Sequence, residues 1–358
     1  MASEKAEIMN PSVQSAPLLG NHLKIGLLRF TIIPKSLLIV PAVNKGNMLR
    51  GGFGHAFRRF CCISECRDAR ACPVAATCPY KLIFEPSPPP DADRLTKNQD
   101  IPRPFVFRPP LSAQTKYEAG QPFEFEMVLI ARSFDALPYF VFVFRELAEG
   151  GLGLNRARCS LKSAEEITVT SPDSGLPQTN HIYSQADELV RAAKGMASDD
   201  WIATRMHELN GCAEETNTND AQTQSLTIRF LTPTFIRADG RIIREPEFHQ
   251  IFKRLRDRIN ALSTFYGDGP LDADFQGLGL RAEKVRKTGG RFEWIDRART
   301  STKTGQRHEL SGFVGEAVYE GDFEEFLPWL ALGEMVHVGR HTAWGNGWME
   351  VQRTEKRG

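Results

Sequence analysis

Apolar residues recur with two different spacings along the first half of the chain, and each spacing predicts a kind of element. Residues 23–33 (LKIGLLRFTII) are rich in β-forming side chains, and residues 122–131 (PFEFEMVLIA) alternate, so both are typical of strands. Residues 47–60 and 134–148 carry apolar side chains at helical spacing, although glycines weaken the start of the first helix. We therefore expect strand, helix, strand and helix in that order.

A similar pattern returns in the second half. Strands are expected at residues 226–236, 313–319 and 348–351, and helices at residues 247–265 and 323–332. Between the halves, residues 161–223 are polar and poorly periodic, and the one helix expected there lies around residues 185–209.

Two successions of strands and helices with glycine turns favour an α+β fold, in which helices cover one face of a mainly antiparallel sheet. We expect two tandem ferredoxin-like (RRM-like) domains with a cysteine-rich insertion in the first. The expected boundaries are a flexible tail at 1–22, an N-terminal domain at 23–160 with the insertion at 61–110, a linker or insertion at 161–224, and a C-terminal domain at 225–358.

Composition places the chain among ordinary globular proteins. Apolar residues make up 41% of it, charged residues 25%, and the formal net charge is +1. A nucleic-acid surface would therefore need local clusters of Lys and Arg. The longest apolar stretch, residues 137–144, is far shorter than the roughly 20 residues of a membrane-spanning helix, and the first 22 residues do not resemble a signal peptide. We expect a soluble, cytoplasmic protein without a membrane partner.

Five of the seven cysteines lie between Cys61 and Cys78. In a cytoplasmic protein such a cluster is better explained by metal binding than by disulfides. Cys62, Cys66, Cys72 and Cys78 supply four thiols within 17 residues, enough for a tetrahedral structural zinc site, with Cys61 left over. The spacing lacks the two CxxC pairs of common zinc ribbons, so an iron–sulfur cluster and unligated cysteines stay open as alternatives.

The sequence GRHTAWGNGW at residues 339–348 is a candidate phosphate-binding loop. Gly339, Gly345 and Gly347 permit close backbone approach, and exposed N–H groups of such a loop can hold phosphates. Three neighbouring residues add polar side chains: Arg340, His341 and Thr342. A tryptophan of the same loop could stack on a base. The alternative is a tight turn with core tryptophans and no ligand.

A cluster of positive charge lies between Glu283 and His308, with eight Lys or Arg residues against three acidic ones. Gly289 with Gly290, and the small polar residues at 300–305, are expected to be turns, so the segment is predicted to be a basic hairpin. Three residues of this hairpin are candidate RNA contacts: Arg297, Arg299 and Lys303. Double-stranded RNA is recognised mostly by shape and backbone, which suits such a hairpin. A solvated face without a ligand is the alternative.

The helix expected at residues 47–60 carries a further set of polar side chains. Arg50, His55 and Arg59 all lie on it, and His55 and Arg59 are four residues apart and so share one face. This face is a candidate RNA contact. A lone helical histidine is more often structural or simply exposed, so its position on the helix does not by itself indicate a catalytic role for His55.

Three stretches resemble the repeat-associated mysterious protein (RAMP) superfamily and, within it, the CRISPR RNA processing endoribonucleases. They are LPWLALGEMVHVGRHTAWGNGW at 327–348, LRGGFGHAFRRF at 49–60, and the cysteine block that ends in CPYKLIFEP at 78–86. The resemblance implies two ferredoxin-like domains side by side, RNA held across them, and metal-independent cleavage that leaves a 2′,3′-cyclic phosphate. Residues 156–224 lie outside the resemblance.

Histidine suits the proton transfers of such a cleavage, and the resemblance favours His55 as the general base, with His341 as its alternative or partner. Arg50 and Arg340 are expected near the phosphate, where they would stabilise developing charge. The expected partners are CRISPR repeat RNA, as precursor and as mature crRNA, and other CRISPR effector subunits. No cofactor is expected for catalysis. A non-catalytic RNA-binding subunit of an effector complex and an iron–sulfur redox protein stay open as alternatives.

Overall fold

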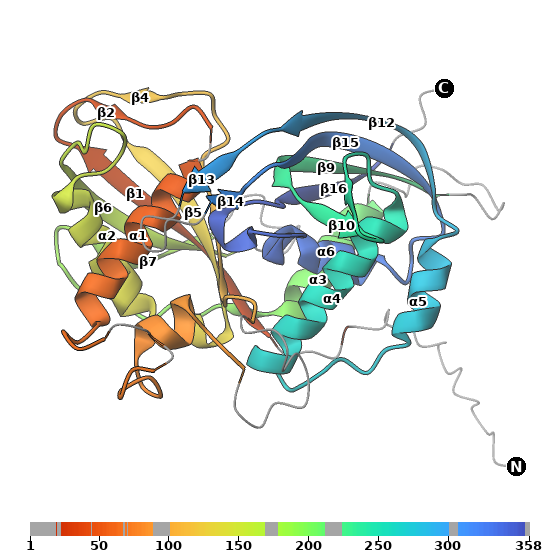
Figure 1. The fold of residues 1–358 in the computed structure, drawn as a ribbon, viewed down its shortest axis with the longest axis horizontal. Helices are drawn as coiled ribbons and strands as arrows, with labels where there is room; N and C mark the ends of the chain where they lie inside the picture. Colours follow the sequence, from red (N-terminus) through yellow and green to blue (C-terminus); the bar gives the residue numbers. More distant parts are fainter. Residues whose placement is uncertain are drawn as a thin grey trace, which may run out of the picture.

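The computed structural model describes Leu19 and residues 23–43, 45–66, 69, 71–88, 101–168, 178–211, 224–300 and 307–354. Within these residues the chain forms two α+β domains side by side, each with helices packed on an antiparallel sheet (Figure 1). Both sheets have the strand order of a ferredoxin-like fold, so the predicted fold class is confirmed.

The first domain follows the order βαββαβ. Its elements are β1 (Lys24–Pro34), α1 (Lys45–Cys61), β3 (Phe105–Arg108), β5 (Phe123–Ile130), α2 (Leu137–Gly150) and β6 (Cys159–Thr168). The strands pair antiparallel in the order β3-β5-β1-β6, and two further strands, β7 (Gln178–Ser184) and β8 (Met196–Ala197), pair with β6 and β1. The first sheet therefore extends beyond the basic ferredoxin-like unit.

The second domain repeats this order. Its elements are β9 (Gln224–Thr234), α4 (Phe248–Tyr266), β12 (Arg286–Ile295), β15 (Gly312–Gly321), α6 (Leu327–Val336) and β16 (Met349–Arg353). The sheet order is β12-β15-β9-β16, all antiparallel. The repetition explains why similar hydrophobic patterns occur in both halves of the sequence.

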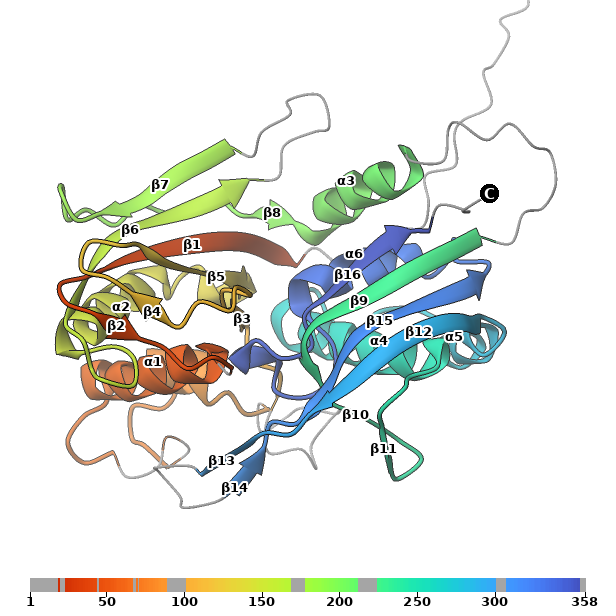
Figure 2. The same cartoon turned by 90° about the horizontal axis from the view of Figure 1, so that it is seen from above.

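Shorter elements complete the fold. They are β2 (Leu38–Ile39), η1 (Tyr80–Phe84), β4 (Lys116–Tyr117), η2 (Ala131–Ser133), α3 (Ser198–Gly211), β10 (Ile236–Ala238), β11 (Arg241–Ile243), α5 (Phe275–Ala282), β13 (Ala298–Thr300), β14 (Arg307–Glu309) and η4 (Thr342–Trp344). Strands β10 and β11 form a small hairpin, and β13 pairs with β14 beyond the end of β12. In Figure 2 these two ribbons project from the same side of the molecule.

Adjacent side chains of the first sheet face two different cores. On β3, Phe105 and Phe107 pack in the core of the first domain, whereas Val106 between them packs in the core of the second. On β5, likewise, Leu129 packs in the core of the first domain and Val128 packs in the core of the second. Successive side chains of a strand point to opposite faces, so a sheet buried on both faces needs nearly continuous apolar runs such as FVF and MVLI.

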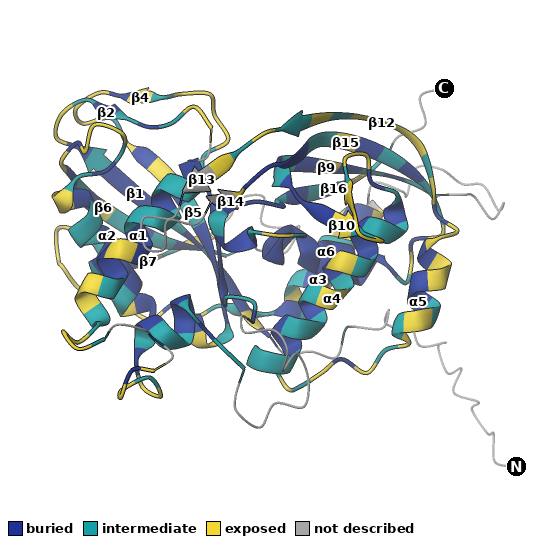
Figure 3. Ribbon diagram, in the orientation of Figure 1, coloured by how far each residue is buried: buried dark blue, intermediate teal, exposed yellow. Residues whose placement is uncertain are grey.

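The core of the first domain is dominated by aromatic side chains. The Phe53 ring on α1 lies 4.9 Å from the Phe144 ring on α2 and 5.7 Å from the Phe107 ring on β3, measured between centroids. All three residues are fully buried, and Figure 3 shows the buried stripes of the two helices facing the sheet. This packing places α1, with its polar face outward, along the front of the domain.

Helices α3 and α6 join the second domain to the other face of the first sheet. Ile202 and Leu209 on α3 belong to the same core as Val128 and Ile130 of the first sheet. The Trp201 indole N–H also donates to the Ala331 carbonyl oxygen on α6 at 2.8 Å. The two domains therefore share a buried apolar contact.

The expectation that residues 161–224 are a linker or insertion is wrong for much of that segment. Strand β6 runs to Thr168, β7 pairs with it, and α3 packs on α6. The pattern was too weak to reveal these elements, because β7 lies at a sheet edge where most side chains are not buried. The helix expected around 185–209 begins only at Ser198, where Asp199 and Asp200 suit a helix N-terminus.

The basic hairpin also differs in detail from the prediction. Gly289 and Gly290 are not a turn but lie inside β12, where the register with β15 shifts between Lys287 and Gly289. Such a β-bulge bends the strand locally but does not end it. The hairpin instead extends through β13 and β14, whose connection at 301–306 lies outside the described residues.

No helix in the described part of the chain is long and apolar enough to cross a membrane.

Candidate functional site

The loop at residues 339–348 is pressed against the backbone of its own domain. Gly339, Gly345 and Gly347 have φ values of 83°, 87° and 74°. A Cβ on Gly347 would lie 1.8 Å from the Val338 carbonyl oxygen, and one on Gly339 would lie 2.6 Å from the Phe235 carbonyl oxygen. Only glycine fits at these two points, because a side chain would both clash and disfavour positive φ.

Several N–H groups of this loop are used inside the protein. Gly345 donates to the Thr342 carbonyl oxygen at 2.8 Å, and Gly347 donates to the Pro233 carbonyl oxygen at 3.1 Å. Thr342 itself is only 6% exposed. The sequence suggested Thr342, Gly345 and Gly347 as RNA contacts, whereas the structure shows them fixing the shape of the loop. A buried N–H group needs such an internal acceptor.

His341 lies at the surface end of this loop. It has φ 62° and ψ 27°, in the left-handed region that is uncommon for a residue with a side chain. Its ring centroid is 4.8 Å from that of Trp344, and both side chains are partly exposed. Backbone strain of this kind persists only where the surrounding structure holds it, and it is concentrated at functional sites.

Helix α1 of the first domain packs against the same loop. The Arg50 guanidinium carbon lies 4.4 Å from the centroid of the Phe84 ring and 4.4 Å from that of Trp344. A Cβ on Gly46 would lie 2.1 Å from the Trp344 carbonyl oxygen. Arg50 was expected near a phosphate, and the structure places its guanidinium between two aromatic rings that come from different domains.

His55 lies on α1, five residues after Arg50, and its side chain is exposed. Arg59, one turn further, is also exposed and lies 3.9 Å from a carboxylate oxygen of Glu146. Both predicted residues therefore share an accessible face. Since α1 contacts η4, the structure places the helix that carries His55 beside the loop that carries His341.

Two residues of the basic segment have contacts inside the protein. Arg297 is partly buried, its backbone N–H donates to the Ser311 hydroxyl at 2.9 Å, and its carbonyl oxygen accepts from Leu310 at 2.9 Å. At the other end of the segment, Lys287 lies 3.1 Å from a Glu247 carboxylate oxygen. The Arg299 side chain and the whole of Lys303 lie outside the described residues, so their roles stay predictions.

A buried polar group behind the loop was not found from the sequence. His337 is fully buried and stacks on Trp348, with ring centroids 5.8 Å apart and planes at 11°. The guanidinium carbon of Arg108, from β3 of the first domain, lies 4.8 Å from the Trp348 ring centroid. Arg108 also donates to the Glu334 carbonyl oxygen at 2.6 Å. These contacts tie the end of the loop to the first domain.

The protonation of His337 follows from the hydrogen bond between its Nδ1 and the Asn346 carbonyl oxygen, which are 3.1 Å apart. A carbonyl oxygen only accepts, so Nδ1 carries the proton. Burial, reinforced by the positive charge of Arg108, holds the pKa of His337 well below its usual value. His337 is therefore neutral and serves as a structural support.

Glu334, on the last turns of α6, is buried as well. It accepts from Arg205 on α3 at 2.7 Å and from the Val351 N–H on β16 at 2.7 Å. Burial raises the pKa of Glu334 even though Arg205 favours the charged form. The carboxylate joins three elements of the second domain.

The predicted zinc ligands lie close in sequence but do not form a recognisable metal site. Among the described residues, no group of three or more His, Cys, Asp or Glu side chains is arranged to hold a metal ion. Burial raises the pKa of Cys61 to about 12, and burial together with the neighbouring Cys72 and Cys62 raises that of Cys66 to about 11. Cys72 and Cys78 are buried. The zinc site stays a prediction.

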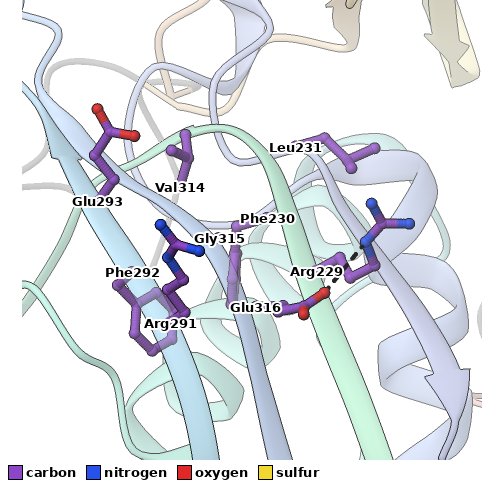
Figure 4. Close-up of a pocket in the computed structure, with 9 residues that line it drawn as sticks. All are labelled: Arg229, Phe230, Leu231, Arg291, Phe292, Glu293, Val314, Gly315 and Glu316. Carbon is purple, nitrogen blue, oxygen red and sulfur yellow. Dashed lines mark ion pairs between the residues drawn. The ribbon is translucent and has the colours of Figure 1, made fainter.

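A shallow hollow of about 530 Å³ lies elsewhere, on the side of the second sheet that carries Arg229 and Arg291 (Figure 4). Arg229 forms an ion pair of 3.6 Å with Glu316 across two strands. Leu231 and Val314 form part of its lining. None of the predicted catalytic, RNA-binding or zinc residues lines this hollow, so it does not belong to the predicted site.

Comparison with protein families gives two matches. Residues 23–195 match a family model described as an N-terminal domain, AF_1859_N. Residues 228–349, which include the loop at 339–348, match the model of the CRISPR-associated endoribonuclease Cas6. The match to the Cas6 model thus lies within the second domain. The RAMP-type resemblance seen in the sequence is confirmed.

Solved structures share the fold of the whole chain. A chain of the partial Cas6-RT-Cas1–Cas2 complex matches with a TM-score of 0.54 and 10% identity over 95% of this chain, which spans 48% of that chain's length. In a second structure of the Cas6-RT-Cas1–Cas2 complex this chain spans 30% of the matched chain. Thermus thermophilus Cas6 has a TM-score of 0.48 and 14% identity, over 93% of this chain and 100% of that one. No curated protein matches the sequence.

Proposed function

We propose that this protein is a Cas6-type endoribonuclease that binds CRISPR repeat RNA and cleaves the precursor transcript into guide RNAs. The observation that carries the proposal is the position of the loop at residues 339–348. This loop lies within the residues that match the Cas6 model and is packed against α1 of the first domain through Arg50 and Trp344. Helix α1 carries His55 and the loop carries His341, so the contact between the two elements supports assigning both histidines to one site.

The proposed cleavage needs no metal ion. The ribose 2′-hydroxyl attacks the adjacent phosphorus, the bond to the 5′-oxygen breaks, and the products are a 2′,3′-cyclic phosphate and a 5′-hydroxyl. One group accepts the proton of the 2′-hydroxyl and another donates a proton to the leaving oxygen. Histidine can do either near neutral pH. His55 is proposed as the base and His341 as its alternative or partner.

Arg340 is the better of the two arginines proposed to stabilise the phosphate. Its side chain is exposed, whereas Arg50 is held between Phe84 and Trp344. A guanidinium placed beside the developing negative charge lowers the barrier to its formation. Arg50 is proposed to support Trp344, and through it the loop.

The test is to incubate the protein with repeat RNA from its own CRISPR locus in the presence of EDTA. Cleavage should continue, the product should end in a cyclic phosphate, and a single 2′-deoxy substitution at the cut should block cleavage but not binding. His55→Ala or His341→Ala should lower the single-turnover rate by roughly 10²–10⁴-fold if that histidine transfers a proton. His207→Ala, at an exposed histidine of α3, is the matched control and should leave the rate unchanged.

Two results would argue against this proposal. Rates within roughly threefold of wild type for both variants, far short of the effect of losing a proton-transfer group, would remove the histidines from the mechanism. Binding of repeat RNA without any cleavage would instead favour a non-catalytic RNA-binding subunit of a CRISPR complex.

Two further proposals concern ligands. Other CRISPR proteins are proposed as partners, since one structural neighbour belongs to a complex that contains Cas1 and Cas2. A structural zinc at Cys62, Cys66, Cys72 and Cys78 is proposed from their spacing, and elemental analysis of the purified protein tests it. Iron with sulfide, or no metal, would contradict the zinc proposal.

A further inference from the structure

Two arginines and two aromatic rings form a row next to His341, with the rings in the middle and one arginine at each end. The Arg340 guanidinium carbon lies 5.5 Å from the Phe235 ring centroid. The Phe235 ring lies 6.3 Å from the Trp294 ring at 54°, and the Arg244 guanidinium carbon lies 4.7 Å from the Trp294 ring centroid. Four residues from four separate segments thus lie one beside the next, and they are here called the arginine–aromatic row.

The two rings of the row are fixed by the fold. Phe235 is 4% exposed, and its carbonyl oxygen accepts from the Arg340 N–H at 3.1 Å. The Trp294 indole N–H donates to an Asp296 carboxylate oxygen at 2.8 Å. The rings therefore form a rigid base, and the arginines that lie on them, Arg244 and Arg340, are both exposed.

Among the described residues, several arginines of the second domain are paired with acidic side chains, whereas Arg244 and Arg340 are not. Arg281 lies 2.7 Å from Glu325, and Arg256 lies 2.8 Å from Asp257. In the described part of the chain, no carboxylate lies within 4.0 Å of the guanidinium of Arg244 or Arg340. An exposed charge with no partner and a fixed orientation is available to a ligand.

We propose that the arginine–aromatic row binds an unpaired nucleotide of the RNA that flanks the cleaved phosphate. The outer face of a guanidinium held flat on a ring is itself a stacking surface for a base, and its charge attracts the neighbouring phosphate. The row begins at Arg340, the residue before His341, so a base stacked there is close to the proposed cleavage point. This inference rests on the proposed function and names a nucleotide contact at Arg244, supported by the rings of Trp294 and Phe235, that the sequence did not suggest.

The hairpin of β10 and β11 adds charge beside the row. It carries Arg237 and Arg241, both exposed, and leads directly into Arg244. Figure 2 shows it projecting on the same side as the ribbon of β13 and β14. Unpaired RNA that leaves the cleavage point in this direction would pass along the exposed arginines of β10 and β11.

The test compares two short probes: a single-stranded oligoadenylate and an abasic oligomer of the same length, which has the phosphates but no bases. Arg244→Ala should weaken binding of the oligoadenylate by about 5- to 150-fold, the usual effect of losing one stacking contact. Binding of the abasic oligomer should fall much less. Arg244→Lys keeps the charge but not the planar surface, so it should lose most of the base-dependent affinity as well.

Arg291→Ala is the matched control. Arg291 is also exposed and lies on β12, three residues before Trp294, but it lines the hollow on the other face of the sheet. It should leave both affinities close to wild type. Equal effects of Arg244→Ala and Arg291→Ala, or full binding by Arg244→Lys, would overturn the stacking role.

The results distinguish a failure of this inference from a failure of the proposed function. If the wild-type protein cleaves repeat RNA but Arg244→Ala binds oligoadenylate normally, the inference about the row fails and the function stands. If the wild-type protein binds neither probe nor repeat RNA, the proposed function fails with it.

Discussion

At the scale of single residues, the packing behind the loop at residues 339–348 depends on His337, a histidine that stays neutral. His337 is fully buried, and the positively charged residues that interact with it are Arg108 and Arg258. A proton on its ring would add a third positive charge to a site without water contact, which costs free energy. Its pKa is therefore low in the folded state and ordinary in the unfolded state, so His337 links stability to pH.

We predict that this histidine makes the protein less stable in mild acid. Below about pH 6.5 the unfolded chain takes up a proton at His337 and the folded protein does not, so stability falls by up to about 1.4 kcal/mol per pH unit. Denaturant unfolding at several pH values measures this slope, and His337→Gln should remove it. Glu334, whose pKa is raised, acts in the opposite direction, so the difference between wild type and His337→Gln is the quantity to compare. Parallel pH profiles would contradict the prediction.

At the scale of elements, the loop at residues 339–348 has its shape because its glycines touch other backbone. Two glycines of the second domain have nearly the same φ but different surroundings. Gly347 has φ 74° with the Val338 carbonyl oxygen 1.8 Å from its Cβ position, whereas Gly240 in the turn of β10 and β11 has φ 75° with nothing within 4 Å. Alanine substitutions at Gly240 and Gly347 therefore distinguish the free-energy cost of a positive φ from the additional cost of a steric clash with the backbone.

We predict that Gly240→Ala lowers the free energy of unfolding by about 1–2 kcal/mol, the cost of a left-handed conformation for a residue with a Cβ. Gly347→Ala should cost clearly more, because the new methyl group also pushes the backbone of Val338 away. It should also slow cleavage, since the loop carries His341. Denaturant unfolding and single-turnover kinetics measure the two effects. Equal losses of stability would show that the loop is not pressed against Val338.

At the scale of the whole molecule, the two domains are joined by a shared core rather than by a linker alone. Val106, Val128 and Ile130 of the first sheet pack with α3 and α6 of the second domain. Arg108 adds a buried hydrogen bond across the same boundary. Unfolding either domain would expose this surface, so the two domains should unfold together.

We predict that a mutation in the core of the first domain destabilises the second domain equally. Ile32→Val, at a fully buried residue of β1 that packs in the first core, should cost about 0.5–1.5 kcal/mol. All five tryptophans lie after residue 200, so their fluorescence reports on the second half of the chain. The unfolding midpoint measured by tryptophan fluorescence should shift as much as the midpoint measured by circular dichroism. Ile251→Val is the matched substitution in the second core, and it should also shift the two midpoints equally. An unshifted tryptophan midpoint in Ile32→Val would show that the domains unfold separately.

His55, His341 and Arg340 were proposed as site residues from charge, spacing and family resemblance. The structure places α1, which carries His55, beside the loop that carries Arg340 and His341. Arg50 and Gly347 were proposed as well, and the contacts that the structure gives them are with the protein itself. Arg244 was missed because no local pattern links it to Trp294, fifty residues later. Such a contact exists only after β11 and β12 are brought together.

By itself the sequence determined the two α+β units, because alternation and helical spacing are local properties that each strand and helix carries within its own residues. It also indicated the glycine loop at residues 339–348 and the cluster of positive charge between Glu283 and His308. The tertiary structure decided which faces of these elements are covered, and so which charges are free. Arg108 and His337 look like surface residues in the sequence, yet packing of the first sheet against the second domain buries both. The physical reason is that burial depends on contacts between segments far apart in the chain, and those contacts set the pKa of a histidine or the freedom of an arginine.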